Sequence, residues 1–404
     1  MLISLEHRLF QEALPVMERI EAAGYEAYFV GGCVRDTLLK RPIHDVDIAS
    51  SARPDEIEAL FHATIDLGKE HGTMIVVYHG ETFEVTTFRT EGTYSDFRRP
   101  DEVTFVRNLE EDTLRRDFTI NALAADSEGV IYDYHGGLSD LEQGYIRAVG
   151  NPAERFAEDS LRTMRALRFA SQLGFEIEGA TYEGVQAYAH QLKQIAIERI
   201  RVEMSKYLQG EAFPQAAHLL VVSGVNQYLP GFDRPDIGQA LAKLSTWLSP
   251  LIEAGIERDE ALVWAFLLYE LRIGSQARQL LRTWTFSKQF MSAVTEMLTI
   301  IEKFDQQEFD LESTYHHTDA YVDLIYQTFA CRNLPLPDVA TMRQQLPIQK
   351  RQDIVVNGKD LMDILGLTKG TKDIGVWLER IERAIIQGDL PNDLEAITHF
   401  IRGD

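Results

Sequence analysis

The hydrophobic pattern divides the chain into two parts of different character. Before about residue 150, short apolar runs rich in β-branched and aromatic residues alternate with polar segments, which is typical of a mixed fold. Residues 3–23 carry apolar side chains at helical spacing, and from Pro152 onward the helical period dominates. We therefore predict an α+β head followed by an all-α arm. The predicted strands of the head are 28–30, 46–49, 74–78, 83–88, 103–106 and 130–132.

Breaks in this pattern suggest where the arm divides. A chain of 404 residues is expected to form more than one domain. Segments rich in glycine and proline interrupt the helical period at 150–152, 210–214 and 335–347. The predicted domains are a catalytic head over 1–150, a helical neck over 151–210, a helical body over 211–335 and a helical tail over 336–404.

Composition limits the class of protein. The chain is 45% hydrophobic and 25% charged, as globular proteins are. No run approaches the roughly 20 apolar residues of a membrane span, and charged residues follow the first methionine too soon for a signal peptide. With only Cys33 and Cys331, neither a disulfide framework nor a thiolate zinc site is available, and Cys33 is interpreted as a small filler residue. We expect a cytoplasmic protein that has no membrane partner.

The net charge of −23 argues at first against a nucleic-acid partner. Its distribution weakens that objection, because residues 151–210 hold eight Lys or Arg and eight Asp or Glu. A strongly acidic protein can still bind a polyanion if its basic side chains face one cleft. Such binding is expected to be modest and sensitive to salt.

Two short segments of the head carry the strongest chemical signal. Gly31 and Gly32 follow an apolar run, and their backbone N–H groups can bind an anion where a helix begins. Asp45 and Asp47 stand two apart in another apolar run, so on a strand both carboxylates project from one face. Carboxylates that converge in this way repel unless a cation such as Mg²⁺ lies between them. The two segments predict Mg²⁺-assisted chemistry on a nucleotide phosphate.

Two nearby residues could extend this site. Arg35 lies one helical turn after the glycines, where its guanidinium can reach the same phosphates or can pair with Asp36. Glu84, in the predicted strand 83–88, is either a third carboxylate near the metal or an outward-facing strand residue.

A second motif covers residues 114–123. Arg116 is the expected contact to sugar or phosphate. Asp117 and Asn121 lie four apart, on one face of a helix, where they could hold a ribose 2′-hydroxyl or brace the metal-binding aspartates. Recognition of that hydroxyl would select ribonucleotides. The alternative is that these two residues only cap and brace the local structure.

A third motif runs from residue 155 to 169. Asp159, Arg162, Arg165 and Arg168 follow one another at the spacing of a helical turn. Cytosine and adenine both present an amino donor beside a ring-nitrogen acceptor, which a carboxylate and a guanidinium match, whereas uracil and guanine present the reverse order. We predict that Asp159 and Arg162 select the base, and that Arg165 and Arg168 contact phosphate. The alternative is a solvated, salt-bridged helix face.

Taken in order, these motifs resemble the class II tRNA nucleotidyltransferases, the CCA-adding enzymes, whose signature bacterial poly(A) polymerases share. The resemblance implies a polymerase-beta-like nucleotidyltransferase head followed by an all-α neck, body and tail. It also implies addition of C, C and A to the 3′ end of tRNA from CTP and ATP, without a nucleic-acid template or an obligate protein partner. The segments that carry it are GGCVRD (31–36), DVD (45–47), RRDFTINAL (115–123), YDYHGGLSDLEQGYIRAVG (132–150), RFAEDSLRTMRALRFA (155–170) and ERIRVEMSK (198–206).

Position by position, the resemblance implies that Asp45 and Asp47 bind the metal. The family's flexible loop matches 89–100, where Arg89, Asp96 and Arg98 are singled out. In the tail, the glycine-rich stretch 356–375 either grips RNA phosphate or is a capped turn between helices. The nucleotide contacts that the resemblance implies are Gly32, Arg35, Arg116, Asp159, Arg162, Arg165 and Arg168, to which the second motif adds Asp117 and Asn121.

Three functions compete at this stage. A CCA-adding enzyme is favoured, because the loop element that CC-only relatives lack is present here. Poly(A) polymerases of this type usually carry a strongly basic C-terminal extension, whereas this chain ends Phe400-Ile401-Arg402-Gly403-Asp404. A non-catalytic RNA-binding protein would be expected to lack Asp45 or Asp47.

Overall fold

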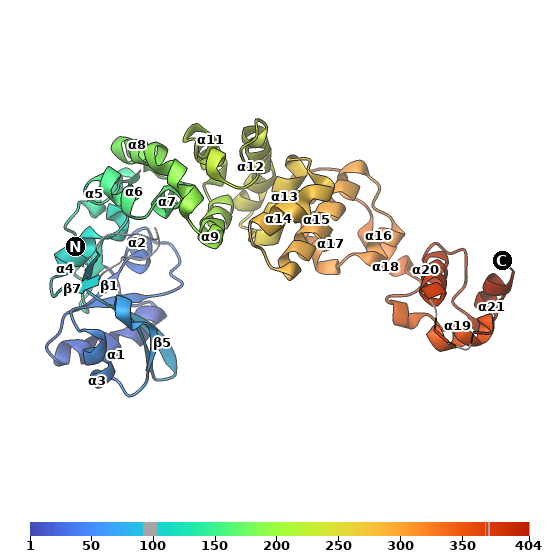
Figure 1. Cartoon of the computed structure of the whole chain (residues 1–404), viewed down its shortest axis with the longest axis horizontal. Coiled ribbons are helices and arrows are strands. Elements are labelled where there is room, and N and C mark those ends of the chain that lie inside the picture. Colours follow the sequence, from blue (N-terminus) through green and yellow to red (C-terminus); the bar gives the residue numbers. More distant parts are fainter. Residues whose placement is uncertain (92–102, 368, 371, 404) are drawn as a thin grey trace. The chain divides into compact units, whose positions relative to one another are not determined.

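The computed structural model describes residues 1–91, 103–367, 369–370 and 372–403 (Figure 1). The chain forms two compact units, Met1–Ala242 and Lys243–Asp404. In the described residues, no helix is both long and apolar enough to cross a membrane. The division into four domains remains a prediction.

A seven-stranded sheet organises the first unit, in the order β3-β4-β5-β2-β1-β8-β9. Neighbouring strands are antiparallel, except that β2 and β5 run parallel. This parallel pair places Asp47 directly opposite Glu84. The strands are β1 (Ala27–Val30), β2 (Asp47–Ser50), β3 (Thr64–Gly68), β4 (Thr73–Tyr78), β5 (Glu81–Thr87), β8 (Ala124–Ala125) and β9 (Ile131–Tyr132).

The two faces of β1 contribute to two different cores, because successive strand residues point to opposite sides. Phe29 packs edge-to-face on Phe10 of α1 (Arg8–Ala22), with ring centroids 4.8 Å apart. Val30 belongs to a smaller cluster with Phe88 and Leu109 on the other face. The helices α2 (Gly32–Leu38) and α3 (Pro54–Leu60) also bury apolar residues in the first of these cores.

All six predicted strands are present, and several others were not predicted. β8 is only two alanines and β3 leaves Ile65 and Leu67 exposed, so neither shows a clear half-buried pattern. Another, β6 (Arg89–Glu91), pairs with β7 (Val103–Phe105) at the start of the expected flexible loop. The helix predicted over 3–23 begins only at Arg8, because the preceding residues pair with the sheet through Leu2 and Val130.

A set of short elements connects the sheet to the helices that follow. Gly137 opens α5 (Gly137–Gln143), and a Cβ there would lie 2.3 Å from the carbonyl oxygen of Thr119. Only glycine therefore permits α5 to approach the 3₁₀ turn η2 (Thr119–Asn121) this closely. The other elements between the sheet and the long helices are α4 (Leu109–Leu114) and β10 (Tyr145–Ile146).

The rest of the first unit is helical, as predicted, apart from β11 (Glu176–Ile177), which pairs with β10. These two-residue strands were not predicted either. Helices α7 and α9 pack side by side. The elements are α6 (Pro152–Glu158), α7 (Leu161–Leu173), α8 (Gly179–Tyr188), η3 (Ala189–Gln194), α9 (Ile197–Leu208), α10 (Phe213–Ala216), α11 (Leu219–Val222) and η4 (Val225–Tyr228).

The described residues of the second unit contain helices and no strand. In its tail stretch, α19 begins with a capping box made by Asn357 and Asp360 and is followed by Gly366 in the left-handed conformation. The described residues thus cap α19 at both ends, and whether this stretch contacts RNA remains a prediction. The helices are α12 (Ile237–Glu253, which spans the boundary), α13 (Glu260–Glu270), η5 (Gly274–Gln276), α14 (Ala277–Thr283), α15 (Lys288–Gln306), α16 (Leu311–His316), α17 (Asp319–Cys331), α18 (Val339–Gln345), η6 (Arg351–Asp353), α19 (Gly358–Leu365), α20 (Lys372–Ile386) and α21 (Leu394–Arg402).

Candidate active site

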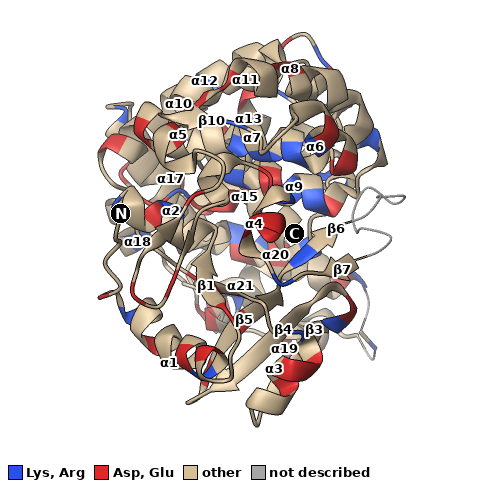
Figure 2. Ribbon diagram, turned by 90° about the vertical axis from the view of Figure 1, so that its left-hand side faces the viewer, with Lys and Arg blue, Asp and Glu red and all other residues tan. Residues whose placement is uncertain are grey.

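One pocket of the first unit, with a volume of about 850 Å³, gathers the predicted site. Among the described residues that line it, nine are Lys or Arg and six are Asp or Glu. Figure 2 shows several of the basic segments on α6, α7 and α9. Asp96 and Arg98 lie outside the described residues. Every other predicted site residue lines this pocket: Gly32, Arg35, Asp45, Asp47, Arg89, Arg116, Asp117, Asn121, Asp159, Arg162, Arg165 and Arg168.

Three carboxylates, here called the acidic edge, form one side of the pocket: Asp45, Asp47 and Glu84. The predicted strand that should carry both aspartates begins only at Asp47, so Asp45 lies in the irregular segment before it. The pairing of strands β2 and β5 brings Asp47 next to Glu84, which is its cross-strand neighbour. The alternation of side chains along one strand, which was the basis of the prediction, does not account for the position of Asp45. Glu84 therefore lines the pocket, while a role for it near a metal stays a prediction.

The acidic edge has the electrostatics of a cation site. Removal from water, followed by the charges of Glu84 and Asp45, raises the pKa of Asp47 to about 6 in spite of nearby Arg116. Burial and Asp45 also raise the pKa of Glu84. Arg116 and Arg89 lower the pKa values of Asp47 and Glu84 only in part, so both remain raised.

Two carboxylates of the acidic edge, Asp45 and Asp47, would be enough to hold a hard divalent cation. No set of three or more His, Cys, Asp or Glu side chains in the described residues is arranged to enclose a metal. Mg²⁺ usually keeps several waters and binds through one or two carboxylates together with substrate phosphates. Two aspartates on the wall of a pocket rich in basic side chains suit that mode of binding.

Arg35 is held inside the protein. Its Nε and Nη2 donate to the two carboxylate oxygens of Asp36 at 2.9 and 2.8 Å, and its Nη1 donates to Asn121 Oδ1 at 2.5 Å. The pairing with Asp36 was the alternative to a phosphate clamp. Gly31, which precedes α2, has φ +73°, so a side chain there would be strained. Contact of Gly32 or Arg35 with phosphate remains a prediction.

The motif at 114–123 is not the single helix that was predicted. α4 ends at Leu114, and Asn121 lies in the 3₁₀ turn η2. Asp117 and Asn121 nevertheless meet, because Asn121 Nδ2 donates to Asp117 Oδ1 at 3.0 Å. Asp117 also accepts from the backbone N–H of Phe118 at 2.8 Å and from Arg165 Nε at 2.6 Å. These contacts support the interpretation that Asp117 and Asn121 brace the local structure, and contact of either residue with the ribose stays a prediction.

The charge of Asp117 is well compensated. Burial alone would raise the pKa of its carboxyl, but Arg165 and Asn121 outweigh burial and hold that pKa well below its usual range. Arg116 is less completely used: its Nη2 lies 3.2 Å from Asp112 Oδ2, whereas its buried Nε has no hydrogen-bond partner among the described residues. Arg116 lines the pocket, and its contact with sugar or phosphate remains a prediction.

Asp159 and Arg162 lie at a helix break, not on one helix. Asp159 is the extended residue that ends α6, and α7 begins at Leu161. The two residues remain adjacent, because the N–H of Arg162 donates to the carbonyl of Asp159 at 3.0 Å. The guanidinium of Arg162 donates to the backbone carbonyls of Arg155 at 2.9 Å and Arg115 at 2.7 Å.

The carboxylate of Asp159 has a partner that was not predicted as a site residue. Arg199 Nη2, on α9, donates to Asp159 Oδ2 at 2.8 Å, and the N–H of Leu161 donates to Oδ1 at 3.1 Å. Arg199 also lines the pocket. It belongs to the motif at 198–206, which identified a family segment but gave no signal that Arg199 faces Asp159.

Three guanidinium groups surround one buried ring, and they are here called the arginine cluster. The Cζ atoms of Arg35, Arg165 and Arg168 lie 5.0, 5.5 and 4.1 Å from the ring centroid of Phe169. Burial, followed by the charge of Arg165, lowers the pKa of Arg168 to about 10. Glu203 on α9 offsets this, with Oε2 at 2.9 Å from Arg168 Nη1. Neither Phe169 nor Glu203 was predicted as a site residue.

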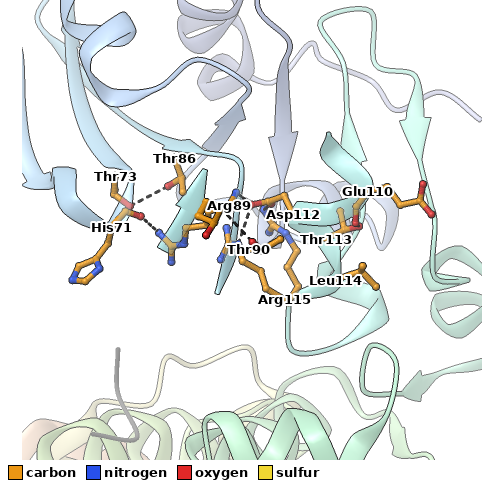
Figure 3. Close-up of polar contacts among 12 residues, drawn as sticks. His71, Thr73, Thr86, Arg89, Thr90, Glu110, Asp112, Thr113, Leu114 and Arg115 are labelled. Atoms are coloured by element: carbon orange, nitrogen blue, oxygen red, sulfur yellow. Dashed lines mark hydrogen bonds and ion pairs between the residues drawn. The ribbon is translucent and has the colours of Figure 1, made fainter. Parts of the chain in front are cut away.

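The first residue of the expected flexible loop, Arg89, lies in strand β6 and is held by hydrogen bonds. Asp112, whose side chain is fully buried, accepts from the backbone N–H of Arg89 at 3.1 Å and from Arg115 Nε at 2.9 Å, as Figure 3 shows. Arg89 also donates to the carbonyl of His71. Arg89 is therefore part of strand β6 and not of an irregular loop, while a role for it in nucleotide selection stays a prediction. Asp112 was not predicted either.

Family models match three parts of the chain. They are described as "Poly A polymerase head domain" over residues 27–147, "Probable RNA and SrmB- binding site of polymerase A" over 174–234 and "tRNA nucleotidyltransferase domain 2 putative" over 257–401.

Similarity to individual proteins extends over nearly the whole chain. A CCA-adding enzyme of Streptococcus pyogenes (serotype M5, strain Manfredo) is 40% identical over 395 residues, which are 97% of this chain and 96% of that protein. The crystal structure of the Bacillus stearothermophilus CCA-adding enzyme in complex with CTP matches with a TM-score of 0.85 and 35% identity, covering 98% of both chains. The Thermotoga maritima CCA-adding enzyme complexed with tRNA, at 20% identity and a TM-score of 0.63 over 98% of this chain and 96% of that one, shares the fold. This chain therefore belongs to the CCA-adding enzymes, a family of tRNA nucleotidyltransferases.

Proposed function

We propose that this protein completes the 3′ end of tRNA by adding C, C and A from CTP and ATP, without a nucleic-acid template. One observation carries the proposal beyond family membership: a single pocket brings Asp45 and Asp47 together with Asp159 and Arg162. The first pair provides what any nucleotidyl transfer needs. The second pair has the hydrogen-bonding groups that match the donor and acceptor order of cytosine and adenine, and not that of uracil and guanine.

In the proposed reaction, the 3′-hydroxyl oxygen of tRNA attacks the α-phosphorus of the bound nucleotide. A phosphodiester bond forms, the bond from the α-phosphorus to the bridging oxygen breaks, pyrophosphate leaves, and the hydroxyl proton passes to water. A divalent cation, Mg²⁺ in this proposal, would be held by Asp45 and Asp47 and would offset phosphate charge and acidify the attacking hydroxyl.

The remaining pocket residues would bind and orient the nucleotide. Arg116 and the three guanidinium groups of the arginine cluster line the same pocket, where they would contact the sugar and the phosphates. Asp159 and Arg162 would accept from the amino group of the base and donate to its ring nitrogen. A site of this kind can reject the wrong base by roughly 10⁴-fold, because the wrong base leaves buried polar groups unpaired. The cytoplasm is the proposed compartment.

The test is to incubate the purified protein with Mg²⁺, all four nucleoside triphosphates and tRNA lacking its 3′ CCA, and to sequence the products. We expect tRNA ending in CCA and no further extension. Incorporation of U or G at rates like those of C, or a long A tail, would contradict the proposal. A product that ends in CC would assign the chain to the CC-only relatives.

A companion variant tests base selection. Asp159→Ala should relax the choice of base more than it weakens binding of the triphosphate, because the triphosphate is held elsewhere in the pocket. Steady-state kinetics with each of the four nucleotides gives both quantities. An unchanged preference for C and A would reject the selecting role of Asp159.

A further inference from the structure

The carboxylate proposed to read the base is oriented by a residue on another helix. Arg199 lies on α9, whereas Asp159 lies in the break between α6 and α7, 40 residues earlier. The 2.8 Å contact fixes Oδ2, and the N–H of Leu161 fixes Oδ1 at 3.1 Å. Both oxygens of Asp159 are therefore placed before any nucleotide arrives.

This orientation matters because Asp159 lacks the restraint of a helix. Its backbone is extended, with φ −134° and ψ 98°, between two helix ends. A carboxylate oxygen has two lone pairs, so each oxygen of Asp159 can accept from the protein and still accept from a base. Without Arg199, Oδ2 loses this side-chain anchor and the carboxylate can rotate. An amino group and a carbonyl group would then be distinguished less sharply.

The partner is also placed so that it can act on the pocket and not only on the fold. Arg199 and Asp159 both line the pocket, and their side chains retain 23% and 17% exposure. The pair is therefore at the pocket surface, where a charged hydrogen bond is short and strong without being fully removed from water. A pair used only to join helices would not need to face the nucleotide.

We infer that Arg199 is a specificity-determining positioning residue, which holds Asp159 in the orientation that accepts the amino group of C and A. The inference rests on the proposed function. Arg199 acts through Asp159 and does not itself need to touch the base. Removing it should therefore alter the choice between nucleotides, with a smaller effect on the affinity for correct ones.

The experiment compares Arg199→Met and Arg199→Lys with the parent protein on tRNA lacking its terminal CCA. The readout is the ratio of kcat/KM for CTP to that for UTP, together with KM for CTP. For Arg199→Met we expect that ratio to fall about 10- to 100-fold, the range that one charged hydrogen bond supports. The KM for CTP should change less than about fivefold, since Arg199 is not assigned a contact with the triphosphate. Arg199→Lys keeps a cationic donor and should recover part of the ratio.

Two controls separate this role from a general one. Arg41→Met removes another arginine–carboxylate pair, Arg41 with Glu211 at 2.8 Å, away from the pocket, and should leave the ratio unchanged. In an Asp159→Ala background, Arg199→Met should cause no further loss of selectivity, because the residue through which it acts is gone. Thermal unfolding of each variant checks that it is folded.

The outcomes are distinct. If the parent protein fails to make CCA ends, the proposed function fails. If the parent makes them and Arg199→Met keeps the ratio, or lowers kcat/KM for CTP and UTP equally, the inference about Arg199 is wrong. Additive losses in the double variant would show that Arg199 acts independently of Asp159, and would also overturn it.

Discussion

The two sides of the pocket balance their charges in opposite ways. In the arginine cluster each cation has a carboxylate partner: Asp36 for Arg35, Asp117 for Arg165 and Glu203 for Arg168. The acidic edge has no such ion pairs among the described residues, and burial, followed by the charges of Glu84 and Asp45, raises the pKa of Asp47. The comparison indicates that the cluster is organised by the fold, whereas the edge needs a ligand to neutralise it. Loss of charge should thus damage stability on one side and catalysis on the other.

The sharpest test of this difference is Asp47→Ala, which removes charge from the acidic edge. We expect addition to fall by about a thousandfold or more, since metal-assisted charge stabilisation contributes several kcal/mol. The free energy of unfolding should not decrease, because the substitution relieves repulsion with Asp45 and Glu84. Single-turnover assays and denaturant melts measure the two effects.

Asp45→Ala is the companion variant, and it should abolish addition while tRNA binding survives. Turnover near that of the parent in either variant would contradict the assignment of a metal to the acidic edge.

The opposite result is expected in the arginine cluster, where Asp117→Asn keeps the size of the side chain but removes its charge. The change leaves Arg165 without its closest carboxylate, and breaking a buried ion pair from one side costs about 3 kcal/mol of unfolding free energy. Urea denaturation at neutral pH checks this. An equally stable variant would show that Glu203, 3.8 Å from Arg165, is a sufficient partner.

A smaller effect is expected from Phe169→Leu, which removes the ring that the three guanidinium groups share. Each cation–π contact contributes about 0.5–2 kcal/mol, and the ring also sets the spacing of the cations. We predict that KM rises about tenfold for CTP and ATP alike, with base selectivity unchanged. A shift in the CTP to UTP ratio would mean that this cluster and the base-selecting pair are coupled.

The smallest effect concerns a paired carboxylate outside the pocket. Glu56 accepts from Arg107 Nη2 at 2.9 Å and from the N–H of Arg53 at 2.6 Å. Mainly through Arg107, its pKa falls from 4.5 to about 2. Because the folded pKa is depressed, the stabilisation is complete above about pH 4.5 and is lost as the pH falls through about 2.

The measurement is the difference in unfolding free energy between the parent and Glu56→Gln. At neutral pH we expect this difference to be below about 1 kcal/mol, because the pair is partly exposed. It should shrink between pH 4.5 and about pH 2. A difference that is independent of pH would assign the effect to packing rather than to charge.

Local pattern was a good guide to the sheet and a poor guide to contacts within the pocket. Alternating β-branched runs identified six strands, whereas β8, with two alanines, carries no such signal. Helical spacing correctly placed Arg162, Arg165 and Arg168 along one helix, but it extended that helix through Asp159, where the backbone is extended.

The compensating partners were missed for a different reason. Asp117 meets Arg165 across 48 residues, and Asp159 meets Arg199 across 40. No periodicity along a chain encodes such pairs, because they depend on how helices pack in three dimensions. The resemblance to a family supplied the residues that were expected to touch the nucleotide, but not the residues that hold them in place.

The excess of basic side chains in the pocket has a kinetic consequence for a chain whose net charge is −23. In about 0.01 M salt the screening length is about 30 Å, so the net negative charge of the whole molecule repels an approaching polyanion before it reaches the pocket. In about 0.1 M salt that length is about 10 Å, and the long-range repulsion fades first. The association rate with tRNA should therefore rise and then fall as salt is added. The rate should be highest at the salt concentration that screens the long-range repulsion by the net charge but not yet the short-range attraction by the basic side chains of the pocket.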